Sequence, residues 1–270
     1  FSVELAGKTI DFTRRYDVLA AAMPGSLGLG WRSSLRDVDL VTNLPAGGSE
    51  ALGLFPPLTE GTRLYLTRPD GQRVAFTFTT VQHSDGPVTW YTAQWLPDQA
   101  DGWTLASAPA KLQRSGERYY HLLSGAAYNP ANAGPGEPAY VLHAPDGTRY
   151  DINPLRGITA ITFADGTALG VSDSGIVARN GDALRWQVDA QGRIEQVRTA
   201  TQLWRYSYDE AGHLVDVRDL VAAASQRYAY GDDGRLNLST TPQGGELIAW
   251  QGVQPAIQPL RGDLGTALAY

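Results

Sequence analysis

The sequence predicts an all-β protein in which consecutive antiparallel β-hairpins form one curled sheet. Its 270 residues include 30 glycines and 16 prolines, which favour tight turns, and 7 Trp, 13 Tyr and 6 Phe residues, which favour strands. Asp-Gly pairs repeatedly separate runs in which apolar and polar residues alternate, a strong hairpin signal. The alanine-rich stretches 20–22 and 221–224 are too short to form a stable helix.

The region 1–150 is predicted to contain irregular β-hairpins. Residues 64–78 and 140–152 each consist of a strand, an Asp-Gly turn and a second strand with alternating side chains. The segments 42–57 and 124–138 are rich in Pro and Gly and are expected to be long loops. Because no interdomain linker is visible, we expect the whole chain to form one continuous structural unit.

Residues 151–240 carry a regular repeat, which begins after a third Asp-Gly hairpin. Three copies occur at 186–197, 206–217 and 228–236, and their glycines are 20 and 22 residues apart. The last region, 241–270, is expected to add one strand followed by a tail punctuated by Pro and Gly.

The middle copy shows how one repeat unit should fold. Tyr206 and Tyr208 are two residues apart, so they lie on the same face of a strand. Asp209 and Gly212 suit the first and fourth positions of a type I turn, and Leu214 begins the returning strand. One hairpin alone is marginal in water, so the units must stack side by side. The residues expected to carry this packing and turn geometry are Trp186, Asp189, Gly192, Tyr206, Tyr208, Asp209, Gly212, Leu214, Tyr228, Tyr230, Gly234 and Leu236.

The repeat resembles a known family. The pattern Tyr-x-Tyr-Asp-x-x-Gly-x-Leu-x-x-Val at 206–217 resembles the YD repeat of Rhs proteins, of the C components of insecticidal toxin complexes, of wall-associated bacterial proteins and of teneurins. The pair Arg15-Tyr16, followed by GSLGLGWR at 25–32, is similar to the segment that opens Rhs cores. The resemblance covers most of residues 12–236.

This resemblance implies a long β-ribbon, coiled into a shell or solenoid, with a non-enzymatic structural role. It implies a secreted or cell-surface bacterial protein whose partners are other segments of a larger Rhs-type protein or a toxin. The chain departs from the family pattern because no Asp-Pro-x-Gly autoproteolysis signature and no toxin-like domain follow Leu236, and its few repeats cannot close a shell. Since it begins with Phe1, we expect a processed product or a piece of a longer protein.

The composition argues against cysteine chemistry, nucleic-acid binding and membrane insertion. The chain has no cysteine, which excludes disulfides, thiol nucleophiles and zinc sites of the cysteine type. The formal charge is −6 and no basic stripe is visible, so no nucleic-acid partner is predicted. The longest uncharged stretch of the N-terminal part, 18–31, contains Pro24 and three glycines, so no membrane-spanning segment is predicted.

No catalytic residue, metal site or cofactor is predicted. Gly25-Ser-Leu-Gly28 lacks the preceding glycine and the strand-turn-helix context of a nucleophile elbow. The histidines have no second ligand at metal-binding spacing, and we expect them to be ordinary strand residues. They are His83, His121, His143 and His213.

Two alternative functions stay open at this point. One is a carbohydrate- or receptor-binding β module, in which clustered aromatic side chains stack on sugar rings or anchor an interface. The aromatic cluster consists of Trp90, Tyr91, Trp95 and Trp103. The competing expectation is that these rings fill the core of an irregular β domain. The other alternative is a glycan-degrading enzyme, which requires a pair of carboxylates that the sequence alone does not reveal.

Overall fold

The computed structural model describes residues 1–134 and 137–261, in which the regular elements are β-strands and short 3₁₀ turns. The strands pair in antiparallel sheets, and most neighbouring strands are consecutive in sequence. This arrangement confirms the predicted all-β fold of successive hairpins. Within the same residues, no helix has the length and apolar character needed to span a bilayer.

The chain divides into two compact units instead of one. The first unit comprises Phe1–Asp37 and Asp173–Tyr270, and the second comprises Val38–Ser172. The N-terminal 37 residues therefore belong to the same unit as the repeats. No change in composition marks this division, because it depends on which side chains meet in space.

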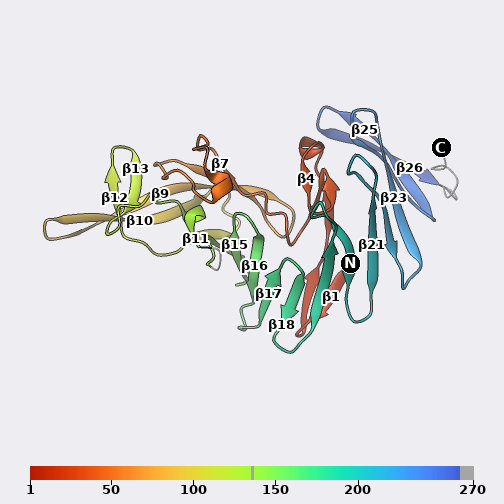
Figure 1. Ribbon diagram of the computed structural model, residues 1–270, viewed down its shortest axis with the longest axis horizontal. Coiled ribbons are helices and arrows are strands. Elements are labelled where there is room, and N and C mark those ends of the chain that lie inside the picture. The colour runs from red at the N-terminus through yellow and green to blue at the C-terminus, as the bar shows by residue number, and fades with distance from the viewer. Residues whose placement is uncertain (135–136, 262–270) are drawn as a thin grey trace. The chain divides into compact units, whose positions relative to one another are not determined.

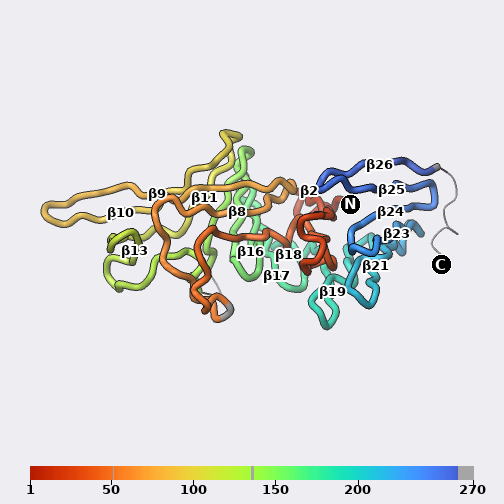
Figure 2. The backbone as a smooth tube through the Cα atoms, turned by 90° about the horizontal axis from the view of Figure 1, so that it is seen from above, coloured from red at the N-terminus to blue at the C-terminus, as the bar shows by residue number. Residues whose placement is uncertain are grey.

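The second unit contains a six-stranded sheet that curls into a half-barrel, with strand order β13-β12-β10-β9-β8-β7. Its β9 and β10 form a long two-stranded arm, visible in yellow-orange in Figures 1 and 2. Alternate residues of β8 and β9, including Leu64, Leu66, Phe76 and Phe78, are buried as the core of this sheet. The strands are β7 (Val41–Thr42), β8 (Arg63–Thr67), β9 (Arg73–Asp85), β10 (Val88–Pro97), β12 (Leu112–Ser115) and β13 (Arg118–His121).

A second group of strands in this unit has the order β11-β14-β15-β16-β17. The Asp-Gly pairs predicted to form turns do so between β14 and β15 and between β16 and β17. The strands are β11 (Thr104–Ser107), β14 (Tyr140–His143), β15 (Arg149–Asn153), β16 (Gly157–Thr162) and β17 (Ala168–Ser172). Two 3₁₀ turns, η2 (Glu50–Leu52) and η3 (Pro130–Asn132), lie in the predicted long loops.

The first unit contains the repeats, and its strands β18 to β26 pair in simple sequence order. Where only one strand was predicted after residue 241, the structure has two long ones, β25 and β26, and residues 262–270 lie outside the described part. The strands are β18 (Gly175–Ala178), β19 (Ala183–Val188), β20 (Ile194–Arg198), β21 (Leu203–Tyr208), β22 (Leu214–Asp219), β23 (Ala224–Tyr230), β24 (Leu236–Thr241), β25 (Gly244–Gln251) and β26 (Gln254–Arg261).

The N-terminal residues fold as three small hairpin-like pairs, β1 with β2, β3 with β6 and β4 with β5. They are drawn in red beside the strands of the repeat sheet in Figure 1. The elements are β1 (Ser2–Leu5), β2 (Lys8–Asp11), β3 (Arg14–Tyr16), η1 (Val18–Ala20), β4 (Pro24–Gly25), β5 (Gly28–Leu29) and β6 (Trp31–Ser33).

One face of the repeat sheet is buried and the other is exposed. Side chains on the buried face, which we name the inner face, come from alternate positions of successive strands, as the period of a strand requires. They include Trp186, Val197, Tyr206, Val217 and Tyr228, all at most 5 % exposed. The inner face is therefore the surface on which the N-terminal residues can pack.

Candidate functional site

The hairpin turns of both units share one geometry. In each five-residue turn the first carbonyl accepts a hydrogen bond from the fourth residue, a glycine, and the first amide donates to the fifth carbonyl. The glycine φ angles lie between 73° and 99°. This is a type I turn followed by a left-handed glycine, one of the common hairpin connections. The turns occupy residues 68–72, 144–148, 163–167, 178–182, 189–193, 209–213 and 231–235.

Asp209 holds its turn in the manner that the sequence predicts. Its Oδ1 accepts hydrogen bonds from the amides of Gly212 and His213, both at 2.8 Å, and its Oδ2 lies 3.0 Å from Nδ1 of His213. Partial burial acts to raise the pKa of Asp209, but the hydrogen bonds from His213 and Gly212 keep that pKa below its ordinary value. In the third copy Gly231 takes the first position, and Asp233 accepts from the Arg235 amide instead, at 3.1 Å.

A hydrogen bond between neighbouring repeats recurs along the inner face. Tyr208 donates its hydroxyl to the carbonyl of Ile194 at 2.6 Å, and Tyr230 donates to the carbonyl of Leu214 at 2.6 Å. Nε1 of Trp250 donates to the carbonyl of Leu236 at 2.7 Å. Each acceptor is the second residue after the turn glycine of the preceding repeat. The second aromatic residue of a repeat therefore fixes that repeat to its predecessor.

A β-bulge explains why this carbonyl is available. In the middle copy Tyr208 pairs with Leu214 and Ser207 pairs with Asp216, so Val215 has no cross-strand partner. The same register shift occurs in the copies before and after it. A bulge disrupts the ladder locally, and the carbonyl beside it can then accept from the aromatic donor of the next repeat.

Aromatic side chains of the N-terminal residues cover the inner face. The Trp31 ring lies 4.7 Å from the Tyr228 ring, centroid to centroid, and Nε1 of Trp31 donates to the hydroxyl of Tyr230 at 2.8 Å. Phe1 stacks on Trp204 with 5.1 Å between centroids and 6° between planes. Such contacts join residues about 200 positions apart into one core.

Polar contacts complete this packing. Arg14 places its guanidinium 5.8 Å from the centroid of the Tyr206 ring, while its Nη2 donates to Oε1 of Gln226 at 3.1 Å. Burial raises the pKa of the Tyr206 hydroxyl, and the nearby Arg14 opposes that shift. The carbonyl of Ser26 accepts a hydrogen bond from the amide of Ile194 at 2.7 Å.

Gly28 is required where the N-terminal residues meet the middle turn. Its φ is +92°, and a Cβ at this position would lie 2.6 Å from the carbonyl oxygen of Gly212 and 3.0 Å from the Tyr208 ring. The next residue, Leu29, donates its amide to the same Gly212 carbonyl at 3.0 Å. Only glycine permits this close approach of two backbone segments.

High pH is expected to destabilise the repeat sheet. Burial raises the pKa of Tyr208 and of Tyr230 above the ordinary tyrosine value of about 10. Protons are therefore held more tightly in the folded than in the unfolded state. The stability from these groups is fully present below pH of about 10 and falls as pH rises further. Melting temperatures recorded against pH, together with tyrosinate absorbance, will check this; a flat stability profile above pH of about 10 would contradict it.

The four members of the predicted aromatic cluster lie in different surroundings, and Trp95 is the buried one. Trp95 is 5 % exposed, its Nε1 donates to Oγ of Ser107 at 3.3 Å, and its ring contacts Phe78 and Tyr140. Trp95 is therefore a core residue, as the competing expectation stated. Its burial leaves no ring face for a ligand.

The other members of the cluster make separate contacts. The half-buried Trp90 stacks on His83 at 4.2 Å, and Nζ of Lys111 lies 4.6 Å from its ring centroid. Tyr91 meets the edge of Tyr119, and Trp103 stacks on Tyr150. Among the ring contacts of the described residues, none joins two of Trp90, Tyr91, Trp95 and Trp103.

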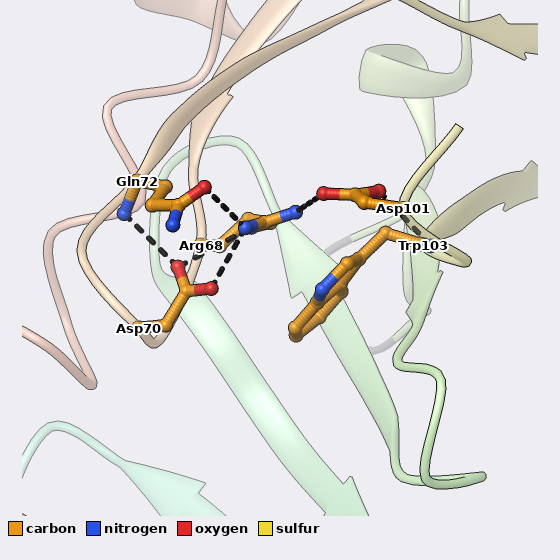
Figure 3. Close-up of polar contacts among 5 residues, drawn as sticks. All are labelled: Arg68, Asp70, Gln72, Asp101 and Trp103. Carbon is orange, nitrogen blue, oxygen red and sulfur yellow. Dashed lines mark hydrogen bonds and ion pairs between the residues drawn. The ribbon is translucent and has the colours of Figure 1, made fainter. Parts of the chain in front are cut away.

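Trp103 belongs instead to a charged cluster around Arg68, shown in Figure 3. The Arg68 side chain is 3 % exposed, and its guanidinium contacts Asp70 at 2.8 Å, Asp101 at 2.5 Å and Oε1 of Gln72 at 2.6 Å. The Trp103 ring lies 4.6 Å from the same guanidinium. The dashed contacts converge on the Arg68 guanidinium, so this cluster ties the 68–72 turn to the segment before β11.

Several residues of the inner face escaped prediction from the sequence. Trp31 was noticed only as part of a motif, and neither Arg14 nor Trp250 was assigned a role. A signal for Trp250 exists, because it stands two residues after inward-facing Ile248, as Tyr208 follows Tyr206. The role of Phe1 has no comparable signal.

Within residues 1–134 and 137–261, no group of three His, Cys, Asp or Glu side chains is placed to hold a metal ion. No family model and no curated protein matches the sequence.

Proposed function

We propose that this chain is a non-enzymatic structural scaffold of the YD-repeat type. The observation that carries the proposal is the hydrogen bond from an inner-face aromatic side chain to the carbonyl of the preceding repeat, which recurs at Tyr208, Tyr230 and Trp250. A contact repeated with the same geometry in successive units is what a stacked array needs, because each unit contacts mainly its neighbours.

We further propose that the chain is a segment of a secreted or cell-surface bacterial protein of the Rhs type. The partners in this proposal are further segments of a larger protein or a toxin. Support comes from the N-terminal residues, whose Gly28 and Trp31 lie on the inner face of the repeats. These N-terminal side chains cover the inner face of the repeat sheet, as the entry segment of an Rhs-type β-ribbon would.

The substitution Tyr208→Phe tests the scaffold. It removes the donor to Ile194, which leaves a buried carbonyl unpaired, and is expected to lower the free energy of unfolding by about 1–2 kcal/mol. Hydrogen exchange should accelerate on both sides of the lost bond, in β20 and in β21–β22. A matched control is Tyr120→Phe in β13, a half-buried tyrosine of the second unit. Equal effects of the two substitutions would count against repeat-to-repeat coupling.

A glycan array distinguishes this proposal from a binding module. If the chain is a scaffold, no glycan should bind specifically to the side chains of β10. Binding that Trp90→Ala abolishes without lowering the melting temperature would replace the scaffold with a carbohydrate-binding function. Trp90 suits this test better than the buried Trp95, whose removal would damage the core.

A further inference from the structure

The exposed face of strands β19–β23, opposite the inner face, gathers five arginines. The cross-strand register places Arg185 opposite Arg198 and Arg205 opposite Arg218. Arg227 lies opposite Asp216 in the next pair of strands. Each alternates along its strand with buried inner-face residues, so these side chains point away from the core. We name this surface the arginine face, defined by Arg185, Arg198, Arg205, Arg218 and Arg227.

The packing of the sheet does not account for this arrangement. Like charges directly opposite each other on neighbouring strands destabilise a sheet, and here two such pairs occur in a chain of formal charge −6. Asp216 is the carboxylate within the arginine face, 2.5 Å from Nε of Arg218 and 3.7 Å from Nε of Arg227. The arginines without an ion-pair partner among the described residues are Arg185, Arg198 and Arg205.

Uncharged hydrogen-bonding side chains and one apolar residue share the face with the arginines. The register places Gln196, Ser207 and Ser225 beside the arginines and Leu203 opposite Arg198. Neighbouring strands lie about 4.8 Å apart, so the arginines are distributed across a width of roughly 20 Å between β19 and β23. An open hollow of about 740 Å³ borders the face at Arg185 and Arg198, and Glu4 and Asp182 also line it.

We infer that the arginine face binds an acidic polysaccharide. Guanidinium forks pair well with carboxylate and sulfate groups, and the interleaved amides and hydroxyls can bond to sugar hydroxyls. The aromatic residues of β19–β23 that flank the arginines, Trp186, Tyr206 and Tyr228, are buried on the inner face, so the arginine face offers no stacking platform for nucleic-acid bases. This inference uses a different surface from the scaffold contacts and does not depend on them.

Binding of the purified chain to immobilised heparin and to polygalacturonate tests the inference. Both should bind, with affinity that falls as salt rises, whereas neutral dextran should not. The double substitution Arg198→Gln with Arg205→Gln should weaken binding at least about tenfold, because two charge-assisted contacts are lost. Its melting temperature should be unchanged or higher, since it also relieves both like-charge pairs.

The matched control is Arg114→Gln with Arg118→Gln, which makes the same change in charge at two exposed arginines of β12 and β13. This variant should keep its affinity within about twofold. The inference is overturned if neither polysaccharide binds, or if the two double variants lose affinity equally. Tighter binding to polyglutamate or to duplex DNA would overturn it in favour of an acidic protein or a nucleic acid.

Discussion

Replacing Trp31 with alanine is expected to lower the free energy of unfolding by about 3–5 kcal/mol. Trp31 is 5 % exposed, packs its ring against Tyr228 and donates its Nε1 hydrogen to the hydroxyl of Tyr230. Truncation leaves a cavity between the N-terminal residues and the repeats, and it also removes one hydrogen bond. Denaturant unfolding of purified protein measures the loss, and hydrogen exchange in β23 and β24 shows where it acts.

Two further variants make the Trp31 result interpretable. Trp31→Phe keeps most of the ring but loses the hydrogen bond, so it should cost about 1–2 kcal/mol. Trp90→Ala removes an equally large but half-buried side chain from the second unit and should cost less than Trp31→Ala. If Trp90→Ala proves as damaging as Trp31→Ala, the N-terminal residues do not contribute to the repeat core as described.

The substitution Gly212→Val is expected to cost about 2–3 kcal/mol through backbone strain. The φ of Gly212 is +99°, a region that a β-branched residue rarely enters. A Cβ at this position would lie at ordinary contact distance from its neighbours, 3.4 Å from a guanidinium nitrogen of Arg193 and 3.7 Å from Leu29, so the cost comes mainly from the backbone conformation. Thermal unfolding measures the loss.

The neighbouring position provides the control for this turn. Ala211→Val adds the same side chain at an exposed residue whose φ is not positive, so stability should change by less than about 0.5 kcal/mol. Gly212→Asn should fall between the two, because asparagine tolerates left-handed backbone better than valine does. Equal losses in all three variants would show that backbone conformation is not what Gly212 supplies.

The turns were the most predictable part of the fold because their chemistry is local. Asp209 and Gly212 interact within five residues, so sequence spacing alone indicates both the carboxylate contact and the positive φ. The strands are also predictable, because apolar and polar residues alternate in the segments between these turns. The strand β26 was missed because Pro255 and Pro259 indicate a tail, although an edge strand tolerates proline where its nitrogen faces solvent.

Contacts between distant residues could not be predicted in the same way. Spacing places Tyr208 on a strand face, but its acceptor, Ile194, becomes available only through a bulge that no sequence pattern marks. The pairing of Trp31 with Tyr228 depends on packing between segments about 200 residues apart. The two-unit division has the same origin, since it follows from the docking of residues 1–37.

Charge patterns across a sheet are likewise invisible along the chain. Arg198 and Arg205 are separated in sequence by neutral residues, and no window of the sequence reads as basic. Antiparallel pairing brings such isolated charges into rows, as at Arg205 and Arg218. Burial is equally hard to predict along the chain, because only the structure shows that Trp95, in the irregular region 1–150, lies on strand β10 with its side chain buried.

The recurring bond from aromatic side chain to carbonyl constrains how this gene region can change in length. Gain or loss of a complete hairpin leaves each surviving unit with an intact neighbour, so duplication and deletion of whole units are tolerable. A single inserted codon within a strand would instead exchange its two faces and carry arginines inward and tyrosines outward. The bulge in each copy already holds one extra residue at a fixed position, so every copy keeps the same two faces.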